Sequence, residues 1–203
     1  MKIIRNLCLI LLLVLLSTFC LTACDNGSEQ AVTYEITVNT NKVSVDTSEI
    51  KVCLYALDGE IVKEEKLDNG KAKFELDADS YVATVSGLDE TVSFSSVLLT
   101  KNSRRATITL ENSDYDEFED SYSYAFTVIV LNGAYKLSDL SAQICDLDLT
   151  CILISFEKDN DNVVDGITNG GECSVEIFDA NNKEIYTETF TVDLDARFYI
   201  VRL

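Results

Sequence analysis

Residues 52–88 read VCLYALDGEIVKEEKLDNGKAKFELDADSYVATVSGL, in which short runs of alternating apolar residues are separated by turn signals. The pair Asp58-Gly59 lies between two such runs, and the triplet Asp68-Asn69-Gly70 marks a second turn. A DG pair in that position is a strong hairpin signal, because both central residues of a type I′ turn need a positive φ. The stretch therefore predicts consecutive antiparallel strands.

The same pattern continues on both sides of this stretch. We expect strands at 32–38, 50–54, 61–67, 71–76, 80–85, 91–100 and 105–110, and then at 126–130, 141–146, 150–156, 172–178, 183–192 and 196–203. Apart from a single turn near residues 137–140, no segment after the leader has the period of a helix. The predicted fold class is all-β, with two tandem β-sandwiches.

The segment ENSDYDEFEDSYS, residues 111–123, is acidic and lacks an apolar period, so we interpret it as a solvated boundary between domains. The alternative is that its aromatic residues, Tyr115, Phe118 and Tyr122, pack on a neighbour. The expected organisation is a signal peptide at 1–23, a flexible tether at 24–31, a first sandwich at 32–110, an acidic linker at 111–123 and a second sandwich at 124–203.

An internal similarity connects the two halves. Residues 52–65, VCLYALDGEIVKEE, resemble residues 175–189, VEIFDANNKEIYTET, and residues 72–76 resemble residues 196–200. The similarity favours two related units. The alternative is that two unrelated hairpins obey the same pleat and turn rules.

Residues 34–110 resemble the prealbumin-like sandwiches of the Cna-B and carboxypeptidase-regulatory types. The matching positions are Asp58-Gly59, Asn69-Gly70, Ala72, Phe74, Tyr81, Val85 and Gly87. Together with the expected organisation, the resemblance implies two tandem Ig-like or prealbumin-like sandwiches after a cleaved signal peptide, and a scaffold more than an activity. Some Cna-B domains carry a Lys–Asn isopeptide bond, but residues 105–110 offer no Asn or Asp, so Lys42 is expected to be an ordinary surface residue.

The N-terminus resembles a bacterial lipoprotein leader. Lys2 and Arg5 precede an apolar run that extends to Cys20 and is followed by Leu21-Thr22-Ala23-Cys24, which resembles a lipobox. The resemblance implies cleavage before Cys24, a diacylglyceryl group on its sulfur, and attachment of an extracytoplasmic protein to the membrane through that lipid. The alternatives are an ordinary secretory signal and an uncleaved anchor helix.

Composition excludes several classes of function. The chain has 16 Lys and Arg against 35 Asp and Glu, and removal of residues 1–23 changes its net charge from −19 to −21. Such a chain is expected to repel nucleic acid and anionic headgroups, both of which need clustered Lys and Arg. There is no His, which removes most triad hydrolases and zinc enzymes, and there is no Trp to stack on sugars.

Four cysteines remain after the anchor: Cys53, Cys145, Cys151 and Cys173. Outside the cytoplasm an even number permits two disulfides. Cys173 has the strand parity of Val175 and Ile177, and we predict a bridge from it to Cys145 or Cys151. The alternative is a set of buried thiols in a reducing setting.

The sharpest cluster of acidic residues lies in residues 157–166, EKDNDNVVDG. The spacing of Glu157, Asp159, Asp161 and Asp165 resembles the oxygen ligands of a calcium loop. Thr168 stands where such a loop has a bidentate Glu, so the alternative is an acidic loop that aids solubility. Calcium is the one cofactor considered, and no other is expected.

These features predict a non-catalytic binding, adhesion or structural module of the cell envelope, with a protein or polysaccharide ligand. One alternative is a calcium-dependent binder of carbohydrate or protein that uses the acidic loop. The other is a small envelope hydrolase with paired carboxylates, for which no sequence motif is present.

Overall fold

Residues 52–88 lie in four strands: β2 (Lys51–Ala56), β3 (Ile61–Lys66), β4 (Lys71–Leu76) and β5 (Tyr81–Ser86). The computed structural model describes residues 31–203 except 118–119, 132–134, 136, 147–150, 156–162 and 169. Its helical structure in those residues is one 3-10 turn, Leu137–Asp139, close to the expected turn. None of the described residues forms a helix long and apolar enough to cross a membrane.

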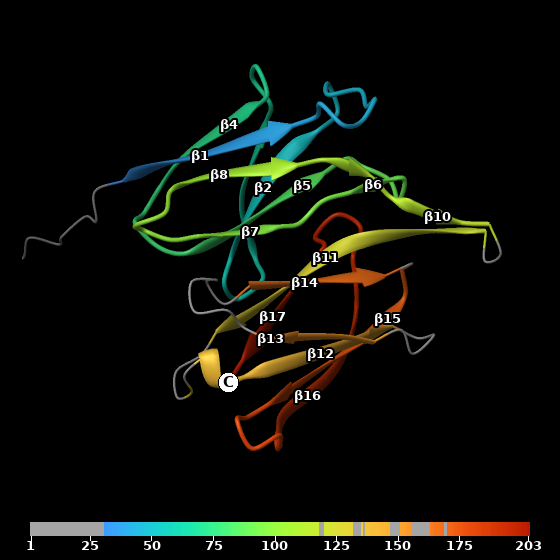
Figure 1. Ribbon diagram of the computed structural model, residues 1–203. Helices are drawn as coiled ribbons and strands as arrows, with labels where there is room; N and C mark the ends of the chain where they lie inside the picture. Colours follow the sequence, from blue (N-terminus) through green and yellow to red (C-terminus); the bar gives the residue numbers. More distant parts are fainter. Residues whose placement is uncertain are drawn as a thin grey trace, which may run out of the picture. The chain divides into compact units, whose positions relative to one another are not determined.

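The first sandwich consists of two sheets with the orders β4-β1-β8 and β3-β2-β5-β7 (Figure 1). Its other strands are β1 (Val32–Asn39), β7 (Val97–Leu99) and β8 (Arg105–Thr109). Tyr34 and Phe74 from one sheet and Leu54 from the other lie in a single core. The strand expected at 91–100 is interrupted: β6 (Val92–Ser93) pairs with β9 (Glu111–Asn112), and β7 pairs with β5.

The second sandwich also consists of two sheets. β11 (Ser121–Leu131) pairs with β10 (Asp114–Asp116), β14 (Val163–Thr168) and β17 (Phe198–Arg202). The other sheet has the order β13-β12-β15-β16, with bounds Cys151–Ser155, Ser141–Asp146, Glu172–Phe178 and Glu184–Thr191. Phe126 and Val128 of β11 pack with Ile144 and Val175 of the facing sheet.

The two sandwiches have the same strand order. In each, the fourth strand pairs with the first and the first pairs in parallel with the last, as β4-β1-β8 and β14-β11-β17. The short strands β6 and β9 form a sheet of their own and are left out of this comparison. In each sandwich the strands of the facing sheet then follow the order third, second, fifth and sixth, as β3-β2-β5-β7 and β13-β12-β15-β16. The predicted fold class, all-β with two tandem Ig-like or prealbumin-like sandwiches, is confirmed.

The internal sequence similarity does not align equivalent strands. Residues 52–65 form the hairpin of the second and third strands, whereas residues 175–189 lie in the hairpin of the fifth and sixth. The two turns share a hydrogen-bond pattern: Ala56 and Glu60 are bonded as Asp179 and Lys183 are. The structure therefore supports the alternative that similar turns obey similar rules.

The turn at Asp58-Gly59 differs from the type I′ turn that the DG pair predicts. Gly59 has φ 92°, but Asp58 is not among the described residues with positive φ. Asn69 and Gly70 both have positive φ, at 52° and 76°. The geometry required of a type I′ turn thus occurs at the second turn signal.

The acidic segment 111–123, expected to be a linker, contains β9, β10 and the start of β11. β10 and β11 are antiparallel, with Tyr115 opposite Tyr122. Residues 32–203 form one compact unit, and the division into separate domains at this segment stays a prediction.

Candidate functional site

Half of the residues of the predicted sites lie outside the described part of the chain. Cys24, the expected lipid site, is one of them, as are Glu157, Asp159 and Asp161 of the expected calcium loop. Asp165 is described, and it accepts a hydrogen bond from Thr127 Oγ1 at 3.0 Å. The described residues contain no group of three or more metal-ligating side chains, and the calcium site stays a prediction.

Asp165 and Gly166, which we assigned to a loop, lie in the middle of β14. Gly166 is opposite Phe126 of β11, and a Cβ atom built on it would lie 2.5 Å from the Phe126 ring. This glycine therefore makes room for a core aromatic ring. The sequence missed β14 because its only continuous apolar residues are Val163 and Val164.

The bonding of the cysteines in the structure differs from the predicted disulfide between Cys173 and Cys145 or Cys151. Cys173 is a buried thiol that donates to Thr168 Oγ1 at 3.4 Å, whereas Cys145 is disulfide-bonded. In the β12–β15 ladder Cys145 lies opposite Ser174, one residue out of register with Cys173. Since consecutive residues of a strand point to opposite faces, Cys145 and Cys173 do not face each other. The residue opposite Cys145 in β13 is Cys151.

Three strands bury side chains on both faces: β2, β5 and β11. One face of each contributes to the core of its own sandwich. The opposite faces form a third apolar cluster, which joins the first sandwich to the second and whose buried members are Cys53, Tyr55, Val82 and Ile129. Phe198 of β17 packs against it, and its ring lies 4.9 Å from that of Tyr55. We call this surface the inter-sheet seam.

Buried hydroxyl groups continue the seam. Ser96 donates from its backbone N–H to Thr127 Oγ1 at 2.8 Å and from its hydroxyl to Thr84 Oγ1 at 3.0 Å. All three side chains are at most 1% exposed. Buried polar groups destabilise a fold unless they are hydrogen-bonded, so these bonds fix how the two sheets meet.

Arg197 is the largest fully buried side chain of the described residues. Its guanidinium donates to Asp89 O at 2.7 Å, to Val92 O and to Leu194 O, and it lies over the rings of Phe94 and Tyr124. Asp89, Val92 and Phe94 belong to the first half of the chain, and Leu194 and Tyr124 to the second. Burial lowers the pKa of this guanidinium, and three carbonyls and two aromatic faces take the place of water.

Sequence reasoning found the cores but missed the seam. We interpreted β2 and β5 from one parity each, Val52 and Leu54 in β2 and Ala83 and Val85 in β5. A signal was present, since Cys53-Leu54-Tyr55 and Val128-Ile129-Val130 are continuously apolar, which is typical of strands buried on both faces.

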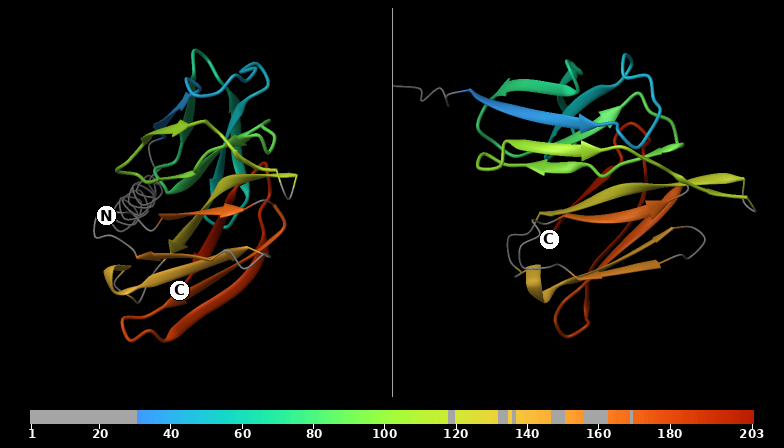
Figure 2. Two further views of the ribbon diagram at one scale, coloured as in Figure 1. Left: turned by 45° about the vertical axis from the view of Figure 1, so that its right-hand side comes forward. Right: turned by 45° about the horizontal axis from the view of Figure 1, so that its top comes forward.

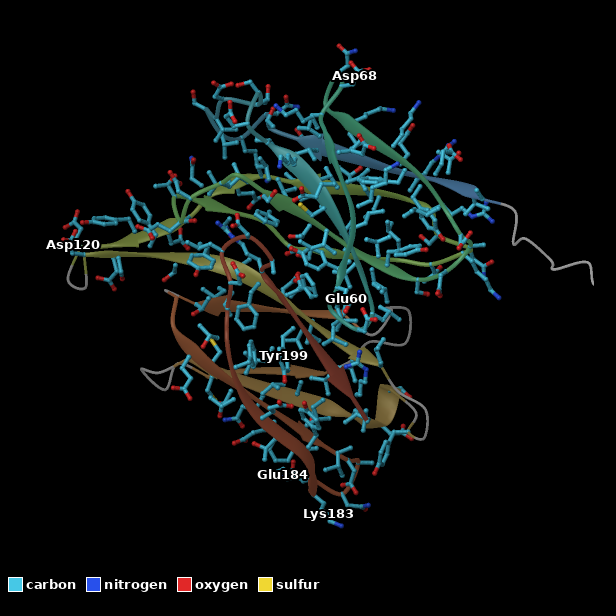
Figure 3. The ribbon with its side chains drawn as sticks, turned by 180° about the vertical axis from the view of Figure 1, so that it is seen from behind. Glu60, Asp68, Asp120, Lys183, Glu184 and Tyr199 are labelled. Atoms are coloured by element: carbon cyan, nitrogen blue, oxygen red, sulfur yellow. The ribbon has the colours of Figure 1, made fainter. Side chains whose placement is uncertain are left out.

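A two-stranded arm formed by β10 and the start of β11 extends away from the other strands (Figure 1). Tyr115 is 48% exposed, and its ring centroid lies 4.9 Å from that of Tyr122. Its hydroxyl donates to Asp120 Oδ1 at the tip of the arm (Figure 3), and this bond raises the pKa of Tyr115. The arm thus presents paired aromatic rings among exposed acids.

No family model and no curated protein matches the chain. Similar solved structures include the Bacillus anthracis TIE protein, with 12% identity, a TM-score of 0.31 and coverage of 85% of this chain and 34% of that one. They also include family 41 carbohydrate-binding modules from streptococcal virulence factors, described for α-glucan recognition, with 10% identity, a TM-score of 0.34 and coverage of 84% and 93%.

The shaft pilin SpaA from Lactobacillus rhamnosus GG has 8% identity and a TM-score of 0.33, with coverage of 85% of this chain and 97% of the pilin. The chain spans about a third of the length of the TIE protein. These likenesses are too low to carry an argument about function, and the fold assignment rests on the strand order given above.

Proposed function

We propose that this chain is a non-catalytic binding, adhesion or structural module of the cell envelope, attached to the membrane through a lipid on Cys24. The observation that supports it best is the inter-sheet seam, because it joins two filled sandwiches into one body. Such a body suits the presentation of a ligand-binding surface in a fixed orientation.

The seam opposes hinge motion for a physical reason. Separation of the two sheets would expose Tyr55 and Ile129 to water and remove the carbonyl partners of Arg197. Burial of apolar surface contributes about 25 cal/mol per Å², and leaving a buried charge without partners is strongly destabilising. A rigid tandem is the expected resting state of the module.

The arm is the part of this body that we assign to ligand contact. Exposed tyrosines are enriched at binding surfaces, because they combine large contact area with few rotatable bonds. The proposed ligand is a protein or polysaccharide of the envelope. Replacement of Tyr115 and Tyr122 by Ala should weaken binding of the mature chain to isolated envelope material, whereas Tyr135→Ala, which alters another exposed tyrosine, should not.

The attachment is tested with two leader cysteines. Cys24→Ala should abolish labelling by radioactive palmitate and leave the leader uncleaved, because the thioether to the lipid cannot form and the cut that follows it cannot occur. Cys20→Ala is the matched control and should leave both properties unchanged. Globomycin should block processing of the wild-type chain. A Cys24→Ala protein that keeps its label would disprove lipid attachment at this residue.

A further inference from the structure

The charges of the chain are distributed unevenly between its two halves. Residues 32–110 contain nine Lys and Arg against 13 Asp and Glu, whereas residues 111–203 contain five against 20. Within the first half, Lys101, Arg104 and Arg105 occur in five consecutive residues without an acid. All three are exposed. Backbone hydrogen bonds between Thr100 and Ser103 close their turn, and the side chain of Arg104 donates from Nε to Lys101 O at 2.7 Å.

This basic turn lies at the end of the sandwich where the chain enters from the tether. β1 and β8 are parallel, with Glu35 opposite Arg105 and a hydrogen bond of 2.9 Å from Glu35 N to Arg104 O. Parallel neighbours start at the same end of a sheet, so the turn precedes β8 beside the start of β1 at Val32 (Figure 2). Residues 25–31 span at most about 25 Å when fully extended.

The outer face of the β4-β1-β8 sheet adjoins the basic turn and carries charges of both signs. Lys73 and Arg105 flank Glu35 in register, and Glu35 forms ion pairs with Lys71 at 3.1 Å and Lys73 at 3.5 Å. These lysines lower the pKa of Glu35. The acids at this end are Glu35, Glu75, Asp77 and Asp79, with Asp58 and Glu60 in the turn after Ala56, because Ala56 and Leu99 both lie opposite Tyr81. The bases are Lys73, Lys101, Arg104 and Arg105, whereas Lys71 lies further along the sheet, opposite Thr37. The basic turn, residues 101–105, is therefore a local positive patch with three bases and no acid in a strongly negative chain.

We propose that this basic turn, residues 101–105, contacts the anionic headgroups of the membrane to which the chain is tethered. The proposal rests on the lipid attachment proposed above, which brings this end to the membrane. Because salt screens charges beyond about 8 Å, the headgroups sense the nearest charges more than the net charge of the chain. The contact sets the orientation of the body on the lipid surface.

The experiment supplies the anchor chemically, so that it does not depend on natural lipidation. The chain from Cys24 onward is coupled through this thiol to a maleimide lipid in vesicles of phosphatidylcholine, with or without phosphatidylglycerol. The protein contains no Trp, so Asn102→Trp places a unique fluorophore in the basic turn. Asn181→Trp, in the exposed turn before β16, is the matched control.

Quenching by brominated lipid should be about twofold greater for the fluorophore at position 102 when phosphatidylglycerol is present, and high salt should remove the difference. Lys101→Gln, Arg104→Gln and Arg105→Gln together should remove it as well, and position 181 should show none. Equal quenching at position 102 in both kinds of vesicle would overturn the proposal. Loss of palmitate labelling in cells would instead refute only the natural anchor.

Discussion

β1 and β11 occupy the same place in two sandwiches of the same strand order, yet their outer faces differ. In β1 the outer residues Glu35 and Thr37 face solvent, whereas in β11 the equivalent residues Thr127 and Ile129 are buried in the seam. Equivalence follows from the ladder bonds, since Glu35 N donates to Arg104 O and Thr127 N donates to Arg197 O.

The two equivalent arginines show the difference most clearly. Arg104 is exposed in a basic turn, whereas Arg197 is fully buried between aromatic rings. The inward parity of the strands determines the sandwich, and the outward parity determines what the sandwich contacts. The same scaffold therefore presents a charged surface in one copy and an apolar joint in the other.

The largest expected effect comes from breaking the joint at Arg197. Arg197→Leu removes every donor to Asp89 O, Val92 O and Leu194 O and should destabilise the protein by about 3 kcal/mol. Chemical denaturation of the mature chain measures the change. Arg202→Leu is the control, since Arg202 is exposed and donates only to Leu57 O among the described partners; it should lose less than about 1 kcal/mol. Equal losses would argue against a special role for Arg197.

Gly166 tests a difference between the two cores. In the first sandwich Tyr34 lies opposite Phe74, whereas in the second Phe126 lies opposite Gly166. Gly166→Ala should destabilise the protein by about 2 kcal/mol, because its Cβ would overlap the Phe126 ring. Gly59→Ala meets no neighbour within 4 Å and should lose only about 1 kcal/mol through its positive φ. A Gly166→Ala protein as stable as wild type would show that Phe126 repacks freely.

Thr127→Val tests the polar part of the seam. The variant keeps the shape but removes the acceptor of Ser96 N–H, and it should lose about 1 to 2 kcal/mol in the same denaturation assay. Thr37→Val, on the outer face of β1, should be nearly neutral. Similar values for both threonines would mean that the Ser96 bond does not stabilise the seam.

Cys53 is expected to give the smallest effect. Burial raises the pKa of its thiol from 9.0 to about 11. A raised pKa stabilises the folded state below pH 9, and this contribution is lost as the pH rises towards 11. Cys53→Ser should flatten the pH dependence of stability in that window. An unchanged profile would indicate that the thiol titrates normally.

The sequence predicted the strands whose apolar residues alternate strictly, such as β4 and β15, with their observed bounds. It failed where a second constraint acts on the strand. β2 and β11 are buried on both faces. From the sequence, only the alternate residues of one face were assigned to a core, and the burial of the other face was missed. The first part of β14 was interpreted as part of a calcium loop, because Asp165-Gly166 is typical of a loop. The reason for a glycine in this strand is the Phe126 ring opposite it, which only the fold brings near. Arg197 could not be foreseen, since its partners lie about a hundred residues away in the chain.

The central claim is that the seam makes one body of the two sandwiches, and calorimetric unfolding of the mature chain tests it most directly. The account predicts a single transition whose calorimetric and van't Hoff enthalpies agree, because neither sandwich keeps its outer face buried alone. Two separate transitions in the wild-type protein, one for each sandwich, would contradict it.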